Sequence, residues 1–541
     1  MCNTMEMLCH GYMLPLVACC FFFLSSICHV LAATRRSSSC CGSHHHAPRS
    51  YPVVGCLVEF YRNRRRLLDW YTGLLAASPT QTVVVDRLGA RRTVVTANPA
   101  NVEHILKGNF ENYPKGRPFT DVLGDLLGGG IFNVDGERWR EQRRLVSHEF
   151  TARALRELVG AALEREARAR LLPELDAAAA AGGEVDLQEL LRQFAFNVIC
   201  RVSLGAGGGG DDELAALPVS RLAAAFDAAA AIIARRGAAP VAAVWKAKRA
   251  LGVGSERRLR EAVKVIHDAI TELIRGRRRK KRHPAARRGG DLVSRMAAAG
   301  YPDEAIRDMV ISFIMAGRDT TSSALTWFFW LMTRHCDVER EVLREIDDGD
   351  GDGGGGGATA GVDLDLDASR KMRVLHAALC ETMRLYPPVA WDSKHAAAPD
   401  VLPDGTRVRR GDRVTYFPYG MGRMEAIWGA DAGEFRPRRW LAAPADGAAA
   451  ASSSSSAAAG GVSPFKFPVF QGGPRTCLGK EMAFVQMKFV ASAVLRRFEL
   501  RPVDGGRTPA FVPLLTAHMA GGLRVTVTKR RQNNGTCERW S

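Results

Sequence analysis

One cysteine near the C-terminal end lies in the local setting that a reactive thiolate requires. Cys477 belongs to the segment FQGGPRTCLG at residues 470–479, where glycines permit a tight turn. A helical pattern over residues 480–497 begins just after it, and the N-terminal end of a helix favours a thiolate. A lone cysteine is usually a small buried apolar residue. The flanking residues at 470–479 instead predict that Cys477 is a metal ligand.

This segment resembles the haem-binding loop of cytochromes P-450, with the pattern F-x-x-G-x-R-x-C-x-G and no departure from it. The resemblance implies haem b (iron protoporphyrin IX) as cofactor and Cys477 as the thiolate ligand of its iron, a ligand that favours O–O cleavage. It also implies supporting positions: Arg475 at a propionate, Phe470 over the sulfur, Gly473 at the tight turn, and Gly479 where the next helix approaches the porphyrin.

A second motif, AGRDTT at residues 316–321, lies inside a long apolar helical segment. An acid and a hydroxyl there are costly unless they have a function. By the resemblance, Gly317 leaves room for dioxygen, and Thr320 and Asp319 relay protons. Relatives that rearrange hydroperoxides without dioxygen typically lack the Asp-Thr pair, so its presence implies a monooxygenase. A helix N-cap is the alternative, but the motif lies in mid-segment.

Glu381 and Arg384 are three residues apart and therefore share one helix face. Such a pair is usually surface decoration that contributes little stability. In the family it belongs to a buried network with an arginine from a downstream loop, and FRPRRW at residues 435–440 resembles that loop. Arg439 is the expected partner, although Arg438 stands where the family frequently has glutamate.

Trp139 and Arg143 in WREQR are four residues apart on a predicted helix and resemble the W-x-x-x-R motif of the family. The resemblance implies that both donate to haem propionates. His395, in the segment WDSKH at residues 391–395, is a weaker propionate candidate, since a lone histidine more often has no such role.

The family architecture also suggests which residues line the substrate pocket. The segment 119–132 is apolar and is expected to be a flexible loop. Core packing stays an open alternative for every candidate, and a pocket of this composition suits a lipid-like chain. The candidates are Phe119, Val122, Leu123, Phe132, Phe313, Val389, Trp391 and Leu514.

Five further segments narrow the resemblance to plant fatty-acid ω-hydroxylase-type enzymes: NYPKGRPF at 112–119, GIFNVDG at 130–136, WDSKH at 391–395, YFPYGMGRM at 416–424 and TAHMAGG at 516–522. WKAKR at 245–249 and VGSER at 253–257 are especially similar to jasmonoyl-isoleucine 12-hydroxylases. Three functions remain open. They are ω-hydroxylation of jasmonoyl-L-isoleucine, ω-hydroxylation of fatty acids for cutin or suberin, and a non-catalytic haem-binding sensor or scaffold.

The chain of 541 residues is predicted to be mainly α with a small β part, and the resemblance implies the cytochrome P-450 fold with one N-terminal transmembrane helix. Helical patterns occupy 138–172, 255–282, 303–336, 370–386 and 478–498, and β-like runs lie near 81–97, 407–417 and 522–528. Four low-complexity segments, at 177–183, 205–212, 347–361 and 442–461, are expected to be surface loops.

The N-terminal part predicts a membrane anchor. Residues 13–33 are apolar and uncharged, and about 20 such residues span a bilayer. Basic residues follow them, which predicts a single-pass protein of the endoplasmic reticulum membrane with its catalytic domain on the cytosolic side. A cleaved signal peptide is the alternative. The predicted divisions are an anchor at 1–34, a linker and Pro-containing hinge at 35–58, the monooxygenase domain at 59–530 and a flexible tail at 531–541.

The net charge of +18 favours anionic partners such as a membrane surface or an acidic protein. No convincing dinucleotide-binding motif occurs, so electrons are expected from a separate NADPH-cytochrome P-450 reductase on the basic face around Cys477. The basic run at 275–288 has no interleaved aromatic residues, which disfavours a nucleic-acid site and favours a solvated helix end.

Overall fold

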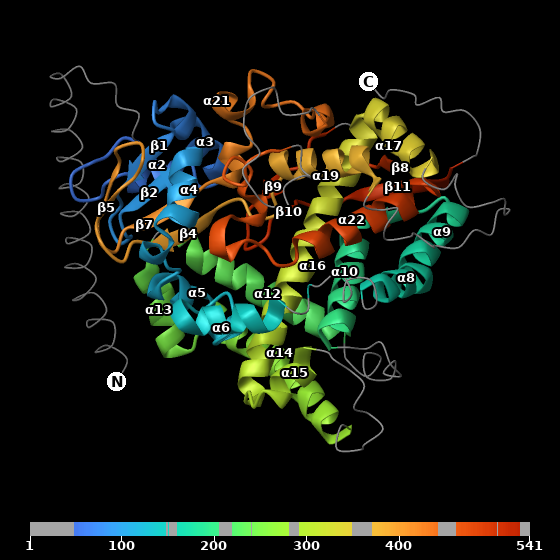
Figure 1. Ribbon diagram of the computed structural model, residues 1–541, viewed down its shortest axis with the longest axis horizontal. Coiled ribbons are helices and arrows are strands. Elements are labelled where there is room, and N and C mark those ends of the chain that lie inside the picture. Colours follow the sequence, from blue (N-terminus) through green and yellow to red (C-terminus); the bar gives the residue numbers. More distant parts are fainter. Residues whose placement is uncertain are drawn as a thin grey trace, which may run out of the picture.

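The computed structural model describes residues 48–147, 150, 159–204, 219–239, 241–280, 292–348, 371–441, 461–505 and 507–530. Helices form most of this part, together with four small sheets, which confirms the predicted class (Figure 1). The predicted anchor, most of the linker and the tail lie outside the described residues and stay predictions. Within the described ranges, no helix combines the length and the hydropathy that a membrane span needs.

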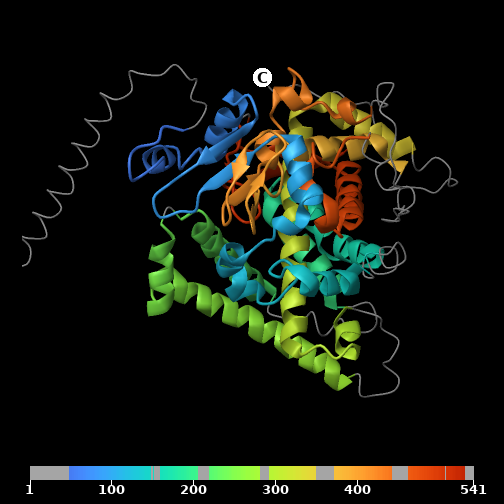
Figure 2. The same cartoon turned by 60° about the vertical axis from the view of Figure 1, so that its left-hand side comes forward.

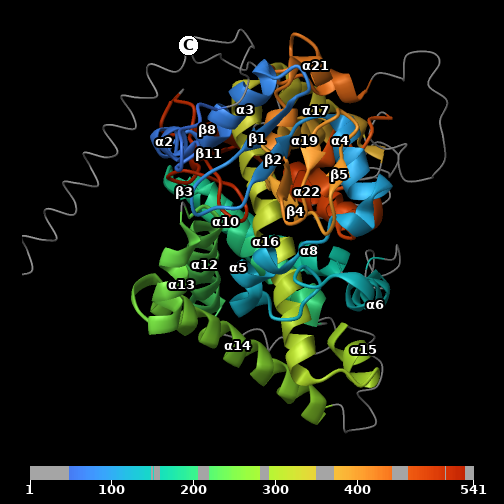
Figure 3. The same ribbon diagram turned by 90° about the vertical axis from the view of Figure 1, so that its left-hand side faces the viewer.

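The helix α16 (Asp303–Arg334) runs through the middle of the molecule (Figures 1 and 3). Asp303 and Glu304 in its first turn carry the charge that favours a helix N-terminus. Further along, apolar side chains are buried on all sides, as expected of a helix enclosed by others. Its partners include α5 (Arg117–Leu127), α10 (Leu187–Leu204), α14 (Gly254–Lys280), α19 (Arg373–Leu385) and α22 (Lys480–Leu495).

Further helices surround α16. Among them, α12 and α13 lie together with α14 at one end of the molecule (Figure 2). The further helices are α2 (Leu57–Arg62), α3 (Leu67–Ala77), α4 (Pro99–Glu103), α6 (Gly136–Ser147), α8 (Ala161–Glu166), α9 (Leu172–Ala181), α12 (Val219–Gly237), α13 (Ala242–Leu251), α15 (Leu292–Ala298), α17 (Cys336–Asp348), α20 (Pro418–Met421) and α21 (Glu425–Trp428).

The main sheet has the order β1-β2-β7-β4, formed by β1 (Thr82–Val85), β2 (Thr93–Thr96), β7 (Arg413–Tyr416) and β4 (Asp392–His395). β2 and β7 are parallel, with Thr93 opposite Arg413, and β4 is antiparallel to β7, with His395 opposite Arg413. A second sheet joins β3 (Glu184–Asp186), β11 (Arg524–Lys529) and β8 (Phe498–Pro502). Two small pairs join β5 (Asp400–Val401) to β6 (Arg407–Val408) and β9 (Phe511–Val512) to β10 (His518–Met519).

The segment 177–183 was expected to be a surface loop, and this prediction is wrong. Its alanines complete α9, because alanine is the best helix former and because Leu172 and Leu175 anchor the helix in the core. The helix ends at Gly182, whose φ of +61° suits glycine as a C-terminal cap. Most of the other three low-complexity segments lies outside the described residues.

The described part of the basic run ends α14, as expected of a solvated helix end. Arg278 there forms an ion pair of 2.9 Å with Asp303 at the start of α16. Residues 281–288 lie outside the described ranges.

The segment 119–132 is also not the flexible loop that its sequence predicted. Most of it belongs to the helix α5, and a glycine turn at residues 128–130 follows. The Asp308 carboxylate on α16 accepts a hydrogen bond of 2.8 Å from the Gly129 N–H. A Cβ atom at Gly128 would lie 2.1 Å from the same carboxylate. The turn is therefore held against α16, and only residues without a side chain allow this approach.

Replacing Asp308 by alanine should cost about 1–3 kcal/mol of unfolding free energy, because it leaves the Gly129 N–H without its acceptor. Urea unfolding followed by circular dichroism would measure the loss. Asp268→Ala is the control, since Asp268 forms an exposed pair with Lys264 and its removal should change stability by about 0.5 kcal/mol or less. Equal effects of the two substitutions would contradict a specific anchoring role for Asp308.

Candidate functional site

Cys477 follows a loop whose backbone conformation depends on glycine. The loop contains the 3₁₀ helices η9 (Pro468–Phe470) and η10 (Gly473–Arg475), and the Cys477 N–H donates to the Phe470 carbonyl at 2.9 Å. At Gly473 φ is +62°, and a Cβ atom there would lie 2.0 Å from the Leu106 carbonyl oxygen. Only glycine meets both conditions, so close packing against the π-helix η1 (His104–Gly108) explains this residue type.

The surroundings of Cys477 have opposing effects on the pKa of its thiol. Its side chain is exposed, yet enough protein surrounds the sulfur for burial to raise the pKa of the thiol. A bond from the Gly479 N–H and the charges of Arg143 and Lys480 lower that pKa in turn. Gly479 caps α22, so a helix N-terminus lies at the sulfur as the sequence pattern suggested. Since burial is the largest of these effects, coordination to a cation is what would complete deprotonation.

Two aromatic contacts connect this loop with its surroundings. Phe470 packs on Phe484 of α22, with ring centroids 5.3 Å apart. Phe150, which no motif singled out, lies 3.5 Å from the position of a Cβ atom on Gly479 and stacks on Phe313 of α16 with centroids 5.6 Å apart. Phe150 therefore bridges the cysteine loop and α16.

Arg475 belongs to the cysteine loop, and Trp139 and Arg143 of α6 lie beside it. Arg143 on α6 donates to the Thr476 carbonyl at 2.7 Å, and Arg475 donates to the Asp135 carboxylate at 2.6 Å. The Arg475 guanidinium lies over the Trp139 ring, 4.5 Å from its centre. Burial lowers the pKa of Arg143 and that of Arg475, so a nearby anion would stabilise both charged forms.

His395 is held by one ring nitrogen. Its Nδ1–H donates to the Lys115 carbonyl at 2.6 Å, while its buried Nε2 has no hydrogen-bond partner among the described residues. Burial lowers the pKa of His395 to about 4, so the ring is neutral at neutral pH. An anion beside Nε2 would favour the protonated ring, which then has a second N–H to donate.

Sequence reasoning missed a buried charge cluster next to these residues. Lys115 and Lys394 both bind the Asp392 carboxylate at 2.9 Å, and the hydroxyl of Tyr416 and the amide of Gln471 donate to it at 3.0 Å. Burial lowers the pKa of Lys394 to about 7, although Asp392 acts against this. Although burial favours neutral Asp392, the two lysines hold its pKa well below the usual range. The segment 391–395 contained the signal, but only Trp391 and His395 were singled out there, for other roles.

These residues fit a dianionic cofactor such as the haem that the resemblance implies. Arg143, Arg475 and Lys115 supply three positive charges and Lys394 a partial one at neutral pH, because its pKa is lowered to about 7. Asp135 pairs with Arg475, and Asp392 pairs with the two lysines. The cluster therefore keeps an excess of positive charge that suits two propionates. The unpartnered Nε2 of His395 adds a polar group of the kind that an anion would satisfy.

The predicted oxygen-activation residues lie in the middle of α16 and not at its N-cap. The Thr320 hydroxyl donates to the Ala316 carbonyl at 2.6 Å, one turn earlier in the helix. A Cβ atom at Gly317 would lie 2.6 Å from Ile199 of α10, so the missing side chain allows these two helices to pack closely. The expected role of Gly317 beside dioxygen stays a prediction.

Asp319 lies in a cluster of charges from three helices. Its carboxylate is 3.6 Å from Arg318 and 3.9 Å from Arg192 of α10, and both arginines also contact Asp227 of α12. Burial raises the pKa of Asp319, while the two arginines lower it. The Oδ1 atom is buried and accepts no hydrogen bond within the described part of the chain, so this carboxyl is poised to take up a proton.

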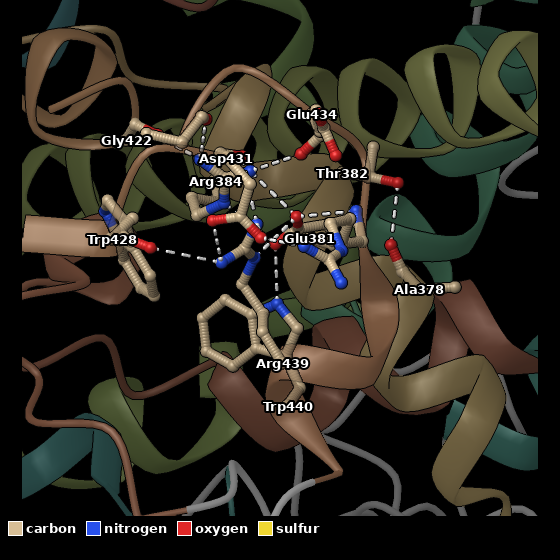
Figure 4. A network of polar contacts seen from close by, with 12 residues as sticks. Ala378, Glu381, Thr382, Arg384, Gly422, Trp428, Asp431, Glu434, Arg439 and Trp440 are labelled. Carbon is tan, nitrogen blue, oxygen red and sulfur yellow. Dashed lines mark hydrogen bonds and ion pairs between the residues drawn. The ribbon is translucent and has the colours of Figure 1, made fainter. Parts of the chain in front are cut away.

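Behind the site, Glu381, Arg384 and Arg439 are in direct contact (Figure 4). Arg384 binds both carboxylate oxygens of Glu381, at 2.8 and 2.7 Å, and Arg439 binds the same carboxylate at 2.9 Å. The Trp440 indole N–H and the Arg436 backbone N–H donate to it as well, both at 2.8 Å. Glu381 and Arg384 are fully buried, so this is a core network and not a surface pair.

The predicted pocket residues occupy different environments. Phe132 is 40% exposed and follows the glycine turn at residues 128–130, so it lies on the surface and does not line a buried pocket. Leu123 is 6% exposed and packs in the main core, as expected if it has a packing role and not a pocket role. The remaining candidates are half-buried: Phe119, Val122, Phe313, Val389, Trp391 and Leu514.

Comparison with known proteins identifies relatives that match most of the chain. Residues 46–519 match the family model described as Cytochrome P450. The chain is 55% identical to Cytochrome P450 94B1 of Arabidopsis thaliana, covering 90% of this chain and 92% of that protein. It is 52% identical to Cytochrome P450 94B3 of the same plant, covering 89% and 92%, and 38% identical to Cytochrome P450 94A1 of Vicia sativa, covering 89% and 90%. The solved haem domain of cytochrome P450DA matches with a TM-score of 0.70 at 20% identity, over 90% of this chain and 97% of that chain, which shows the shared fold.

Proposed function

Because the chain belongs to the cytochrome P450 family, we propose that it is a haem-thiolate monooxygenase that hydroxylates the terminal carbon of a lipid-like carboxylic acid. Its substrate in this proposal is jasmonoyl-L-isoleucine, hydroxylated at C12 in jasmonate catabolism. The reaction is RH + O2 + NADPH + H+ → ROH + H2O + NADP+. It weakens the hormone signal by converting the active conjugate into a hydroxylated one.

The observation that carries the monooxygenase class is the bridge between the cysteine loop and α16. Phe150 stacks on Phe313 of α16 and lies beside Gly479, so the cysteine loop packs near the helix that carries Asp319 and Thr320, as the proposal requires. The choice of substrate is supported by the sequence likeness of residues 245–249 and 253–257 to jasmonoyl-isoleucine 12-hydroxylases. The similarity to the two Arabidopsis relatives extends over about nine tenths of the chain.

Each residue has a distinct role in this proposal. The haem, when bound, supplies the oxygen-activating chemistry. Cys477 ligates its iron, and the cations of Arg143 and Arg475 neutralise its propionates. Asp319, whose pKa is raised by burial, accepts protons from the solvent side and passes them towards the Thr320 hydroxyl. The bond from Thr320 to the Ala316 carbonyl orients that hydroxyl and leaves its lone pairs free to accept.

We also propose NADPH-cytochrome P-450 reductase as the electron source, docked on the basic face near Cys477. In this proposal the chain is a single-pass protein of the endoplasmic reticulum membrane, anchored by residues 13–33, with its catalytic domain in the cytosol. The apolar, uncharged character of 13–33 and the net charge of +18 support both statements.

Product analysis in microsomes that contain this protein and a plant reductase tests the proposal. Supplied with jasmonoyl-isoleucine and NADPH, they should form the 12-hydroxylated product. If lauric acid is hydroxylated at its ω carbon and the conjugate is not, the function is fatty-acid ω-hydroxylation for cutin or suberin. If the reduced carbon-monoxide complex shows the red-shifted thiolate band but no NADPH- and O2-dependent product forms, the protein is a haem-binding sensor or scaffold.

Replacing Asp319 by asparagine should lower turnover about a hundredfold, because it removes an acid–base group from proton delivery. The raised pKa of Asp319 gives this carboxyl a larger protonated fraction at each pH than a surface aspartate has. Activity of the wild type should therefore fall as pH rises through that pKa, and this fall should vanish in Asp319→Asn. The rate of product formation and the product formed per NADPH consumed, both measured as a function of pH, test this prediction.

Asp303→Asn, in the first turn of the same helix, is the matched control and should keep both the rate and the pH profile. An Asp319→Asn protein with a wild-type pH profile and full coupling of NADPH to product would exclude the proton-relay role.

A further inference from the structure

Two arginines at the main sheet, Arg413 and Arg87, carry N–H groups that no described residue satisfies. Arg413 begins β7, and its Nε–H is buried and finds no acceptor among the described residues. The Nη1 atom of Arg87, which lies just after β1, is also buried and has no acceptor among the described residues. The Arg87 guanidinium lies over the Phe60 ring at 3.9 Å, which orients it without neutralising it.

Two carboxylates near the ends of this sheet are already engaged, and the side chain of Asp86, which follows β1, is exposed. Asp412 binds Arg92 and accepts from the Arg409 N–H at 2.8 Å. Asp69 of α3 accepts from the Tyr419 hydroxyl at 2.9 Å.

Positive charge accumulates around Arg413 as a result. Burial, followed by repulsion from Arg87 and Arg91, lowers the pKa of Arg413, and only the Tyr71 hydroxyl acts the other way. A partly buried guanidinium without a counter-ion is costly, and a carboxylate is the anion that its planar N–H fork fits best. The arrangement therefore suits an anionic ligand from outside the chain.

Aromatic side chains lead from this sheet towards the centre of the molecule. Tyr71 and Trp391 both contact the Phe417 ring, with centroids 6.2 and 6.0 Å away. Phe417 also contacts Tyr419, which lies 5.2 Å from Phe511, and Phe511 lies 5.8 Å from Trp327 of α16. Trp391 is among the predicted pocket residues. Because Phe417 and Trp327 are fully buried, these rings form a continuous packed core between the sheet that carries Arg413 and α16. A substrate chain bound at Arg413 would lie beside this core, where half-buried Trp391 is located.

We propose that Arg413, assisted by Arg87, binds the carboxylate of the substrate and so directs its opposite, terminal carbon to the reaction site. This assignment rests on the proposed ω-hydroxylation of a carboxylic acid. A haem propionate also carries a carboxylate and is the alternative ligand of Arg413, because His395, a predicted propionate residue, lies opposite Arg413 on β4. The proposal assigns the site to the substrate.

Paired binding measurements on the haem-loaded full chain test this assignment without depending on turnover. Lauric acid and methyl laurate are titrated separately, and the dissociation constants are read from the haem spectrum and from tryptophan fluorescence. The wild type should bind the acid at least tenfold more tightly than the ester. Arg413→Gln should remove this difference by weakening acid binding alone, while Arg413→Lys should retain part of it. Arg410→Gln, an exposed neighbour of equal charge, is the matched control and should behave as the wild type.

Three results would overturn the assignment. They are a wild type that does not distinguish acid from ester, an Arg413→Gln protein that keeps the preference, and a loss of bound haem in Arg413→Gln while the remaining holoprotein still prefers the acid. The last result would assign the arginine to a propionate. If Arg413→Gln does not fold, Arg87→Gln replaces it and should reduce the preference at least threefold. Failure to form any hydroxylated product, with the acid preference intact, would instead reject the proposed function and keep the binding site.

Discussion

Replacing Cys477 by serine should reduce hydroxylation to background while the protein stays folded. The serine hydroxyl stays protonated at neutral pH and cannot supply the electron density that a thiolate ligand gives to haem iron. Serine also fits the loop, because the bond from the residue 477 N–H to the Phe470 carbonyl involves backbone atoms only. The reduced carbon-monoxide complex should lose its red-shifted thiolate band, and product analysis with jasmonoyl-isoleucine and with lauric acid should show no NADPH-dependent product.

Cys56→Ala serves as the control for this substitution. Cys56 is a free, buried cysteine in the smaller core beside the main sheet, so its loss should leave the thiolate band and the activity in place. A Cys477→Ser protein that keeps NADPH- and O2-dependent turnover would remove the central assignment of this site.

Replacing Glu381 by glutamine should destabilise the protein by about 3–5 kcal/mol, the usual cost of leaving one partner of a buried ion pair uncompensated. Glu381 accepts bonds from Arg384, Arg439, Trp440 and the Arg436 backbone, and a glutamine side chain has only one oxygen with which to accept them. Arg384 would keep a buried charge without its counter-ion. The thermal unfolding temperature and the fraction of protein that binds haem should both fall.

Arg438→Gln, in the same loop as Arg439, provides the comparison. Arg438 pairs with Glu341, but its side chain is 81% exposed, so its loss should cost about 1 kcal/mol or less. If Glu381→Gln were no more destabilising than Arg438→Gln, the network would have no structural role beyond that of a surface pair.

Long-range contacts explain the features that were not predictable. The Lys115–Asp392 pair joins residues 277 positions apart, and no local pattern indicates that two lysines share one carboxylate. Asp308 lies 179 positions from the glycine turn that it holds, which is why residues 119–132 read as a flexible loop. The motif around Gly317 suggests room for a ligand, but it gives no sign that Ile199 of a different helix packs against this glycine.

Features that depend on neighbouring residues were predictable from the sequence. These are the glycine-dependent turn before Cys477, the helix that follows it, the shared face of Glu381 and Arg384, and the mainly helical class, because φ restrictions and helical periodicity act over a few positions. Which charged side chains meet depends instead on how distant elements pack. Packing surrounds Asp392 with two lysines and leaves N–H groups of Arg413 and Arg87 without acceptors in the described part of the chain, since the partners of a buried charge are selected by strands and helices distant in sequence.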